Sequence, residues 1–338
     1  MCIRWSGRLK SMRSMKRFIF KRRAAGDLDL NEISKSPAAL SIRRMEGGRK
    51  MDVQLILNEL HETGVLESHM RNLKPLTGGT SSKVVVVMDE TKPRYVIKQN
   101  DPAVVEAEAE FLHTYVQVEK LSRLVYVDPL HRYLVYTFRS GLTQYHGRNK
   151  TDLLLRLATE VISHYKPIGG ERHYGYSDHP FVEWRDFLLH RMKESEKIIQ
   201  DVLPPEDHRF VHTLVAGSPP RNIKYLLHGD CGVHNFVFAE NGTLTGIIDP
   251  DPVVGEPLYD LIYAFCSSPD RLTVDTILPA LEKLGPEMTE EYELNREVLL
   301  GLYFRIATCI RHHPGDLDQY TEAWTYWLDR VRCKEEGI

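Results

Sequence analysis

Residues 228–235 read His228-Gly229-Asp230-Cys231-Gly232-Val233-His234-Asn235, and Ile247-Ile248-Asp249 adds a second carboxylate fourteen residues after Asn235. Two β-prone segments lie between them, at 236–238 and 244–248, and they are joined through Asn241-Gly242. Asn-Gly is the strongest short-range hairpin signal, so the pattern predicts an antiparallel hairpin. Such a hairpin places Asn235, before the first strand, close to Asp249, after the second.

These polar side chains suit one kind of chemistry. Phosphoryl transfer needs a carboxylate that orients a hydroxyl nucleophile, and oxygen ligands that hold Mg²⁺ against the phosphates. We predict that Asp230 is the catalytic residue and that Asn235 and Asp249 are the metal ligands. Either aspartate alone is more typical of a surface turn or a helix cap. The predicted hairpin, which brings the three residues together, favours the phosphoryl-transfer interpretation.

The segment after Asp249 reads Pro250-Asp251-Pro252-Val253-Val254-Gly255-Glu256-Pro257-Leu258-Tyr259-Asp260-Leu261. With it, the chain resembles the aminoglycoside phosphotransferase and choline kinase group of small-molecule kinases. Their signature is His-Gly-Asp, four residues and Asn, then a hydrophobic residue and Asp, Gly-Asp-Pro, and Asp-Leu. This chain has Glu256 in place of the Gly-Asp-Pro aspartate, and Pro250 where the family often has Trp. The resemblance implies the roles given above, and it makes Asp260 a structural residue that braces the catalytic loop.

A glycine-rich turn precedes the apolar run at 84–88. Its residues Gly78, Gly79, Thr80 and Ser81 could present backbone N–H groups to phosphate, although a Gly-Gly-Thr turn is more often only a turn. The strand pattern Tyr95-Val96-Ile97-Lys98 then ends in a lysine where kinases keep the lysine that contacts the α- and β-phosphates. We therefore predict that the turn and Lys98 bind the nucleotide.

A helix is predicted over 104–115, where the sequence resembles the family's Glu-Ala-x-x-Leu segment. We choose Glu108 as the partner of Lys98, with Glu106 and Glu110 as competitors, because only about one helix position in three faces inward. The strand at 133–136 breaks at residues 139–141. In the kinase layout this break is the hinge between lobes.

The resemblance implies an α+β, bilobal, protein-kinase-like fold with a small β-rich N-terminal lobe carrying one helix and a larger, mainly helical C-terminal lobe. We predict three parts: a basic extension at 1–50 that is disordered or non-native, an N-lobe at 51–141 and a C-lobe at 142–338. Helices are expected near 151–165, 180–200, 258–266, 288–312 and 317–333. The cluster His312, His313, Asp316, Asp318 and Glu322 lacks the spacing of a metal site, and Asp316 or Asp318 is expected to cap a helix.

Composition indicates a cytoplasmic protein. Of the 338 residues 42% are hydrophobic, yet no run of eighteen apolar residues occurs to span a membrane. The five cysteines have no disulfide or zinc spacing, and Cys231 is expected to be a small residue in a tight loop.

Charge is uneven along the chain. Residues 1–50 carry fourteen Lys and Arg against four acids, so the remainder carries −13 within a total of −3. Met45-Glu46-Gly47-Gly48 resembles a translated ribosome-binding site, which makes Met51 the expected native start; a transit peptide is the alternative. The acidic remainder disfavours nucleic acid as a partner and favours a cationic small molecule.

Only ten residues separate Asp249 from Asp260, and Gly229 stands where protein kinases have Arg, so a small-molecule acceptor is favoured over a protein. The predicted activity is transfer of the γ-phosphoryl group of ATP, or of GTP, with Mg²⁺, to a hydroxyl of an aminoglycoside-like antibiotic, an amino alcohol or an amino sugar. The alternatives are a metabolite kinase of the homoserine, fructosamine or thiosugar type and a non-catalytic nucleotide-binding scaffold. A monomer or homodimer is expected.

Overall fold

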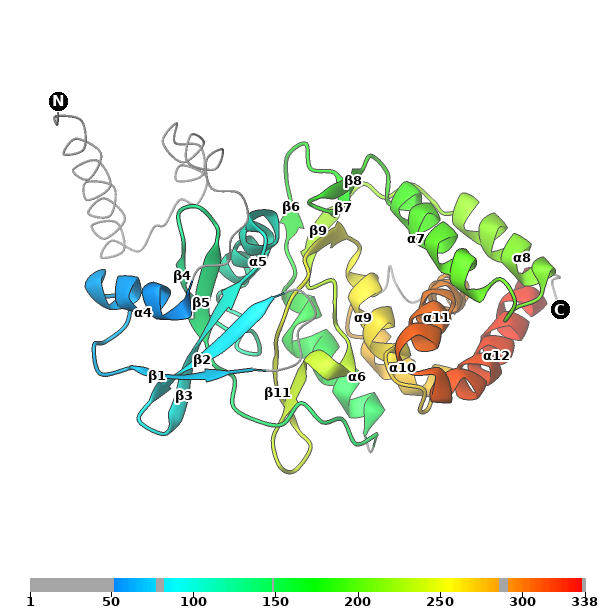
Figure 1. Cartoon of the computed structure of the whole chain (residues 1–338). Helices are drawn as coiled ribbons and strands as arrows, with labels where there is room; N and C mark the ends of the chain where they lie inside the picture. Colours follow the sequence, from blue (N-terminus) through cyan, green and yellow to red (C-terminus); the bar gives the residue numbers. More distant parts are fainter. Residues whose placement is uncertain (1–51, 77–81, 148, 286–290, 336–338) are drawn as a thin grey trace. The chain divides into compact units, whose positions relative to one another are not determined.

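The computed structural model describes residues 52–76, 82–147, 149–285 and 291–335. These residues form two compact units along the chain (Figure 1). The first unit holds the described residues up to Glu106 together with Leu124–Phe138, and the second holds Ala107–Arg123 and the described residues from Arg139 onward. The predicted glycine-rich turn at Gly78–Ser81, the basic extension and Met51 lie outside the described residues.

The first unit is built on a five-stranded antiparallel sheet with the order β1-β2-β3-β5-β4. Its strands are β1 (Asn72–Pro75), β2 (Lys83–Asp89), β3 (Lys92–Gln99), β4 (Leu124–Val127) and β5 (Tyr133–Thr137). The strand predictions at 84–88, 95–98 and 133–136 are therefore confirmed. In β2 and β3, Val84 pairs with Lys98, and Lys98 in turn pairs with Leu134 of β5.

One face of this sheet is covered by α4 (Val53–Glu62), whose first turn is capped by the Asp52 side chain (Figure 1). The apolar positions of α4 recur at helical spacing, and Ile56, Leu57 and Leu60 are fully buried. They pack on alternate residues of β2, β3 and β5, among them Val87. Because side chains of a strand alternate between the two faces, the same strands can present other residues to the opposite face.

The next helix, α5 (Pro102–Thr114), begins in the first unit and ends in the second. It corresponds to the helix predicted at 104–115. Glu108 is fully buried on α5, and Lys98 is almost fully buried on β3. The two glutamates that compete with Glu108 have other partners. Glu106 lies within ion-pair distance of His131, and Glu110 pairs with Arg172.

The second unit contains two small sheets. Strands β6 (Pro167–Ile168), β9 (Lys224–Leu227), β12 (Val253–Gly255), β7 (Tyr174–Tyr176) and β8 (His179–Phe181) form one sheet in this order. The other is the hairpin of β10 (Phe236–Phe238) and β11 (Leu244–Ile247), in which Phe236 pairs with Ile247. The predicted hairpin is thus confirmed, with Gly242 at its tip in the left-handed region at φ 80°.

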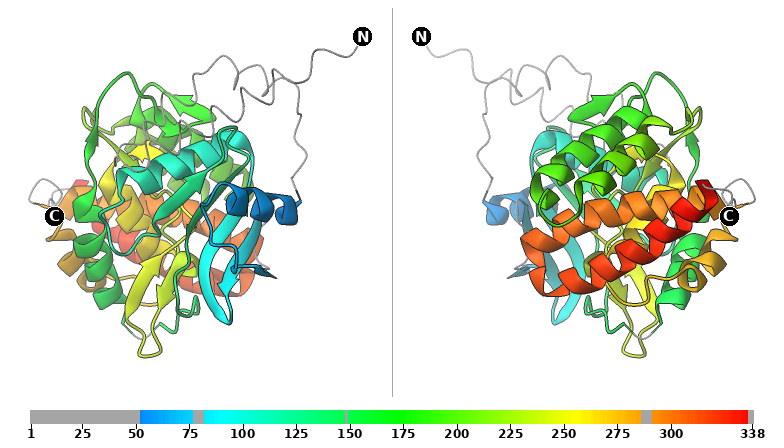
Figure 2. Two further views of the ribbon diagram at one scale, coloured as in Figure 1. Left: turned by 90° about the vertical axis from the view of Figure 1, so that its left-hand side faces the viewer. Right: turned by 90° about the vertical axis from the view of Figure 1, so that its right-hand side faces the viewer.

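Helices make up most of the second unit. They are α6 (Lys150–Glu160), α7 (Trp184–Ile199), α8 (Pro205–Ala216), α9 (Pro257–Cys266), α10 (Val274–Leu281), α11 (Glu291–His312) and α12 (Leu317–Glu335). Figure 2 shows α7 beside α8 and α11 beside α12 on one side of this unit. Among the described residues, no helix combines the length and apolar character that crossing a bilayer requires.

Three parts of this unit differ from the sequence-based predictions. The helix predicted at 151–165 ends at Glu160 and is followed by a separate 3-10 turn at Ile162–His164. The helix predicted from 180 begins only at Trp184, because His179–Phe181 pairs with β7 to form a hairpin. Helices α8 and α10 were not predicted. Helix α10 has only eight residues and carries an internal Pro279, which weakens its helical signal.

Candidate functional site

The predicted catalytic residue Asp230 lies in the loop between β9 and the 3-10 turn η2 (Val233–Asn235). Nδ2 of Asn235 donates hydrogen bonds to the backbone oxygen of Asp230 at 3.0 Å and to its Oδ2 at 2.8 Å. Nε2 of His234 lies 3.3 Å from the same Oδ2. The carboxylate that was predicted from the motif is therefore held by two side chains of the motif itself.

The Asp230 carboxylate is ionised over the physiological range. Burial raises its pKa, but hydrogen bonds from His234 and Tyr263 and the charge of His234 outweigh this effect and bring the pKa to about 2. Tyr263 lies on α9, one turn beyond Asp260, and was not predicted as part of the site. An ionised carboxylate can accept a hydrogen bond from an acceptor hydroxyl and thereby orient its oxygen.

The loop that carries Asp230 is braced by Asp260 at the start of α9. The backbone N–H of His228 donates to Oδ2 of Asp260 at 2.8 Å, and that of Gly229 donates to Oδ1 at 3.0 Å. The hydroxyl of Tyr165 also donates to Oδ2, at 2.7 Å. The prediction that Asp260 supports the loop is confirmed. Burial raises the pKa of Asp260 to about 6, although these three donors lower it.

The glycine of the His-Gly-Asp triplet is required by its surroundings. Gly229 has φ 78°, and a Cβ atom there would lie 1.9 Å from the backbone oxygen of Asp251. The N–H of Asp251 donates to the oxygen of His228 at 2.9 Å, so this close approach is fixed by a backbone bond. Only a residue without a side chain fits such a position.

The two predicted metal ligands flank the β10–β11 hairpin. The N–H of Ile248 donates to the backbone oxygen of Asn235 at 2.9 Å, which ties the residue before Asp249 to Asn235. Asn235 is almost fully buried, whereas Asp249 is exposed and has a left-handed backbone at φ 59°. Aspartate tolerates this conformation better than most residues do. The Nδ2 of Asn235 is used by Asp230, so its Oδ1 is the atom suited to a metal.

An amide oxygen and a carboxylate form the donor set that Mg²⁺ prefers when phosphates complete its shell. The residues therefore fit the ion. No cluster of three or more His, Cys, Asp or Glu side chains suited to a metal occurs in the described ranges.

Cys231 is fully buried, and burial raises the pKa of its thiol well above the usual value. A protonated, enclosed thiol is unsuited to nucleophilic chemistry, in agreement with the expectation of a small loop residue. Lys98 lies in the first unit and Glu108 in the second, and their pairing stays a prediction.

A model of the phosphotransferase enzyme family matches residues 72–293, more than half of the chain. The chain belongs to this family, and the resemblance drawn from the His-Gly-Asp segment is confirmed.

Solved structures support the α+β, protein-kinase-like fold. Choline kinase from Cryptosporidium parvum Iowa II has a TM-score of 0.54 at 11% identity, and the match covers 85% of this chain and 97% of that one. The streptomycin–ATP complex of APH(2")-IIa has a TM-score of 0.52 at 18% identity, covering 82% and 99%. A thermostable mutant of the aminoglycoside phosphotransferase APH(4)-Ia, in complex with AMP-PNP and hygromycin B, has a TM-score of 0.51 at 17% identity. That match covers 83% of this chain and 98% of the other. No protein of curated function matches this chain.

Proposed function

We propose that this protein transfers the γ-phosphoryl group of a nucleoside triphosphate, ATP or GTP, to a hydroxyl group of a small molecule. The observation that carries the proposal is the hydrogen-bonded pair of Asp230 and Asn235 on a loop braced by Asp260. Membership of a phosphotransferase family agrees with it. The fold neighbours that hold ATP with streptomycin, or AMP-PNP with hygromycin B, support a nucleotide donor and a small-molecule acceptor.

In the proposed reaction Asp230 accepts a hydrogen bond from the acceptor hydroxyl and orients its oxygen toward the γ-phosphorus. A bond forms between this oxygen and phosphorus, and the bond to the β–γ bridging oxygen breaks, so that its electron pair leaves with the nucleoside diphosphate. The hydroxyl proton passes to Asp230 and then to solvent. Asn235 and His234 keep the carboxylate oriented throughout.

Oδ1 of Asn235 and the carboxylate of Asp249 would hold Mg²⁺, which supplies charge neutralisation on the phosphates when bound. Lys98, with Glu108 as its proposed partner, would contact the α- and β-phosphates, and Gly78, Gly79, Thr80 and Ser81 keep their proposed role as nucleotide-binding residues.

Two classes of acceptor remain under this proposal. The net charge of −13 on residues 51–338 favours a cationic acceptor such as an aminoglycoside-like antibiotic, an amino alcohol or an amino sugar. A kinase of the homoserine, fructosamine or thiosugar type would use the same catalytic loop and differ only in the acceptor pocket.

The test uses mass spectrometry of reaction products. The full chain is incubated with Mg-ATP or Mg-GTP and a pool of aminoglycosides, choline-like amino alcohols, amino sugars and hydroxy amino acids. A product heavier by one phosphoryl group, absent when Asp230→Asn is used, supports the proposal. Failure of the wild-type protein to bind Mg-nucleotide would overturn it, and the non-catalytic scaffold would be favoured by nucleotide binding without any transfer.

A further inference from the structure

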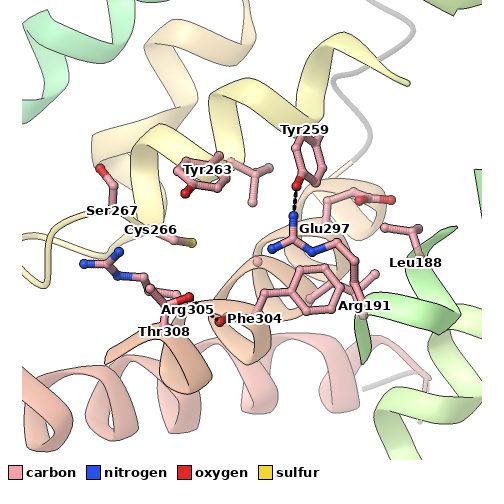
Figure 3. A pocket seen from close by; sticks show the side chains of 13 residues that line it. Leu188, Arg191, Tyr259, Tyr263, Cys266, Ser267, Glu297, Phe304, Arg305 and Thr308 are labelled. Carbon is pink, nitrogen blue, oxygen red and sulfur yellow. Dashed lines mark hydrogen bonds between the residues drawn. The ribbon is translucent and has the colours of Figure 1, made fainter. Parts of the chain in front are cut away.

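A cavity of the second unit adjoins the Asp230 loop. We call it the Arg191 cavity, and it is lined by side chains of α7, α9 and α11, including Arg191, Tyr259, Tyr263, Ser267, Phe304 and Arg305 (Figure 3). Tyr263 hydrogen-bonds the Asp230 carboxylate, and Oγ of Ser267 accepts from the N–H of Val233 at 3.1 Å. The cavity has a volume of about 40 Å³, which suits a small group rather than a whole acceptor, and a group placed in it lies against the residues that hold the Asp230 loop.

Arg191 lies at the centre of the cavity lining, with its guanidinium group among aromatic rings (Figure 3). One of its nitrogens donates to the hydroxyl of Tyr259. Its guanidinium carbon lies 5.1 Å from the ring centre of Phe304, 5.7 Å from that of Tyr259 and 6.0 Å from that of Phe187. These rings shield the cation in part, and the bond to Tyr259 uses only one of the five N–H donors of the guanidinium group.

Among the described residues, the Asp230 carboxylate acts on the charge of Arg191 without forming an ion pair with it. No carboxylate among those residues lies within ion-pair distance of its guanidinium group. Glu297 also lines the cavity, but its Oε1 lies 3.9 Å from Nη2 of Arg221, which is its ion-pair partner. A second guanidinium, that of Arg305, lines the cavity and donates to the hydroxyl of Tyr320 at 3.0 Å. The lining thus carries an excess of positive charge.

An open groove of about 400 Å³ adjoins the cavity and shares Arg191, Phe304 and Thr308 with it. This volume falls in the range of small-molecule sites. The groove is also lined by a second guanidinium, that of Arg311, and by the carboxylates of Asp178 and Glu194, of which Glu194 pairs with Lys197. Of the charged residues that line either space, Arg191 is the one that lines both.

We propose that the acceptor carries an oxyanion, a carboxylate or a phosphate ester, which Arg191 binds while the acceptor hydroxyl faces Asp230. The inference rests on the proposed function and names its substrate class. A planar guanidinium matches either oxyanion through paired N–H···O bonds. Arg191 is partly buried and makes no ion pair with a carboxylate of the described residues, and a bound oxyanion would supply one.

The positive lining does not conflict with the acidic surface. A charge of −13 is spread over the whole chain and is screened beyond about 8–10 Å, whereas a guanidinium inside a cavity acts at contact distance. A hydroxy amino acid, which carries both an ammonium and a carboxylate group, satisfies both conditions. The cavity thus favours the metabolite-kinase alternative over an acceptor with cationic groups alone.

The experiment measures the binding of matched probes to the full chain by calorimetry, with and without AMP-PNP. The pairs are homoserine against aminopropanol, glycerate against ethylene glycol, and glycerol phosphate against glycerol, so each pair differs by its oxyanion. The first two pairs test a carboxylate and the third tests a phosphate ester. Choline and kanamycin represent acceptors with cationic groups alone.

Arg191→Met removes the guanidinium group while keeping an unbranched side chain. Arg185→Met makes the same substitution on the same helix, at an exposed residue that pairs with Glu183 and does not line the cavity. Arg191→Lys keeps the charge but loses the planar fork. Arg191→Lys replaces Arg191→Met in the experiment if Arg191→Met fails to fold. It should retain only part of the preference for an oxyanion probe over its matched analogue.

We expect at least one oxyanion probe to bind about tenfold or more tightly than its matched analogue. Arg191→Met should abolish this preference, and Arg185→Met should retain it. The inference is overturned if no oxyanion probe binds, if choline or kanamycin binds more tightly than every oxyanion probe, or if the preference survives in both Arg191 variants. If an oxyanion probe binds but no phosphoryl group is transferred, the proposed function is contradicted and the inference about Arg191 is not. Transfer to cationic acceptors at equal rates in wild type and Arg191→Met would remove only this inference.

Discussion

The side-chain amide of Asn235 donates to Oδ2 of Asp230 at 2.8 Å, so the candidate metal ligand directly holds the candidate catalytic carboxylate. The same amide cannot rotate to present nitrogen to a metal without losing this bond, which fixes its oxygen as the available ligand. One buried side chain therefore serves two functions of the proposed reaction. Substitutions at Asn235 should therefore impair the proposed reaction more than they impair folding.

Asn235→Ala removes both the donor to Asp230 and the proposed metal ligand. We expect kcat to fall by about a hundredfold or more and the Mg²⁺ concentration for half-maximal rate to rise. The measurement is initial rate against Mg²⁺ concentration at saturating nucleotide. His234→Ala, which removes only an exposed neighbour of Asp230, should reduce kcat less and leave the Mg²⁺ dependence unchanged. Equal Mg²⁺ dependence in Asn235→Ala and wild type would contradict the ligand assignment.

Asp260→Asn tests the brace beneath the catalytic loop. The substitution turns one acceptor oxygen into an N–H₂ group, which then faces the N–H of His228 or Gly229 or the hydroxyl of Tyr165. We expect the free energy of unfolding to fall by about 3 kcal/mol, because a buried charged acceptor is lost and a donor is left without a partner. Urea denaturation measures this change.

Asp249→Asn is the matched control for Asp260→Asn. Asp249 is exposed and has a left-handed backbone that asparagine also adopts readily, so unfolding should change by no more than about 0.5 kcal/mol. If the two variants were equally destabilised, the brace would have no special energetic role.

The sequence was sufficient for the parts of the site that lie close together along the chain. Asn241-Gly242 predicts the hairpin that ties Ile248 to Asn235. Local turn chemistry and strand alternation determine this feature, so a short segment contains the information. The brace at Asp260 was predicted only from the family resemblance, since it joins residues about thirty positions apart.

The remaining parts depend on contacts between distant segments. Tyr165 reaches Asp260 across 95 positions, and nothing around Tyr165 distinguishes it from other core tyrosines. Tyr263 could have been found, since it lies one helical turn after Asp260 on the same helix. Arg191 could not have been found from the sequence, because the residues around it on α7 have the pattern of an ordinary amphipathic helix. Its surroundings are formed by aromatic rings of other helices.

Gly229→Ala tests the close approach of the backbone in the catalytic loop. A Cβ at 1.9 Å from the oxygen of Asp251 must displace the loop, so we expect a loss of stability above about 3 kcal/mol together with loss of activity. Gly242→Ala has almost the same backbone angle, φ 80°, but an open surrounding, and should cost only about 1 kcal/mol. Thermal denaturation of both variants separates backbone strain from steric overlap, and equal losses would show that strain alone decides the outcome.

Glu256, which replaces the family's aspartate in the Gly-Glu-Pro segment, predicts a pH dependence of stability. Burial raises the pKa of Glu256, the charge of Arg221 lowers it, and the charge of Glu297 raises it further, so that the pKa is about 7. The folded protein therefore holds the proton more tightly than the unfolded chain, in which the carboxyl titrates near 4.5. This contribution to stability is full below about pH 4.5 and is lost as the pH rises through about 7.

Between about pH 5 and pH 8 the free energy of unfolding should consequently fall by about 2 kcal/mol on account of Glu256, after allowance for partial screening by solvent. Glu256→Gln should flatten the upper part of this slope, and the residual slope should come from Asp260, whose pKa is raised to about 6. Glu183→Gln, at an exposed glutamate of the same unit, should keep the wild-type slope. The free energy of unfolding is measured by urea denaturation across this pH range. An unchanged slope in Glu256→Gln would mean that Glu256 ionises in the folded protein as it does in the unfolded chain.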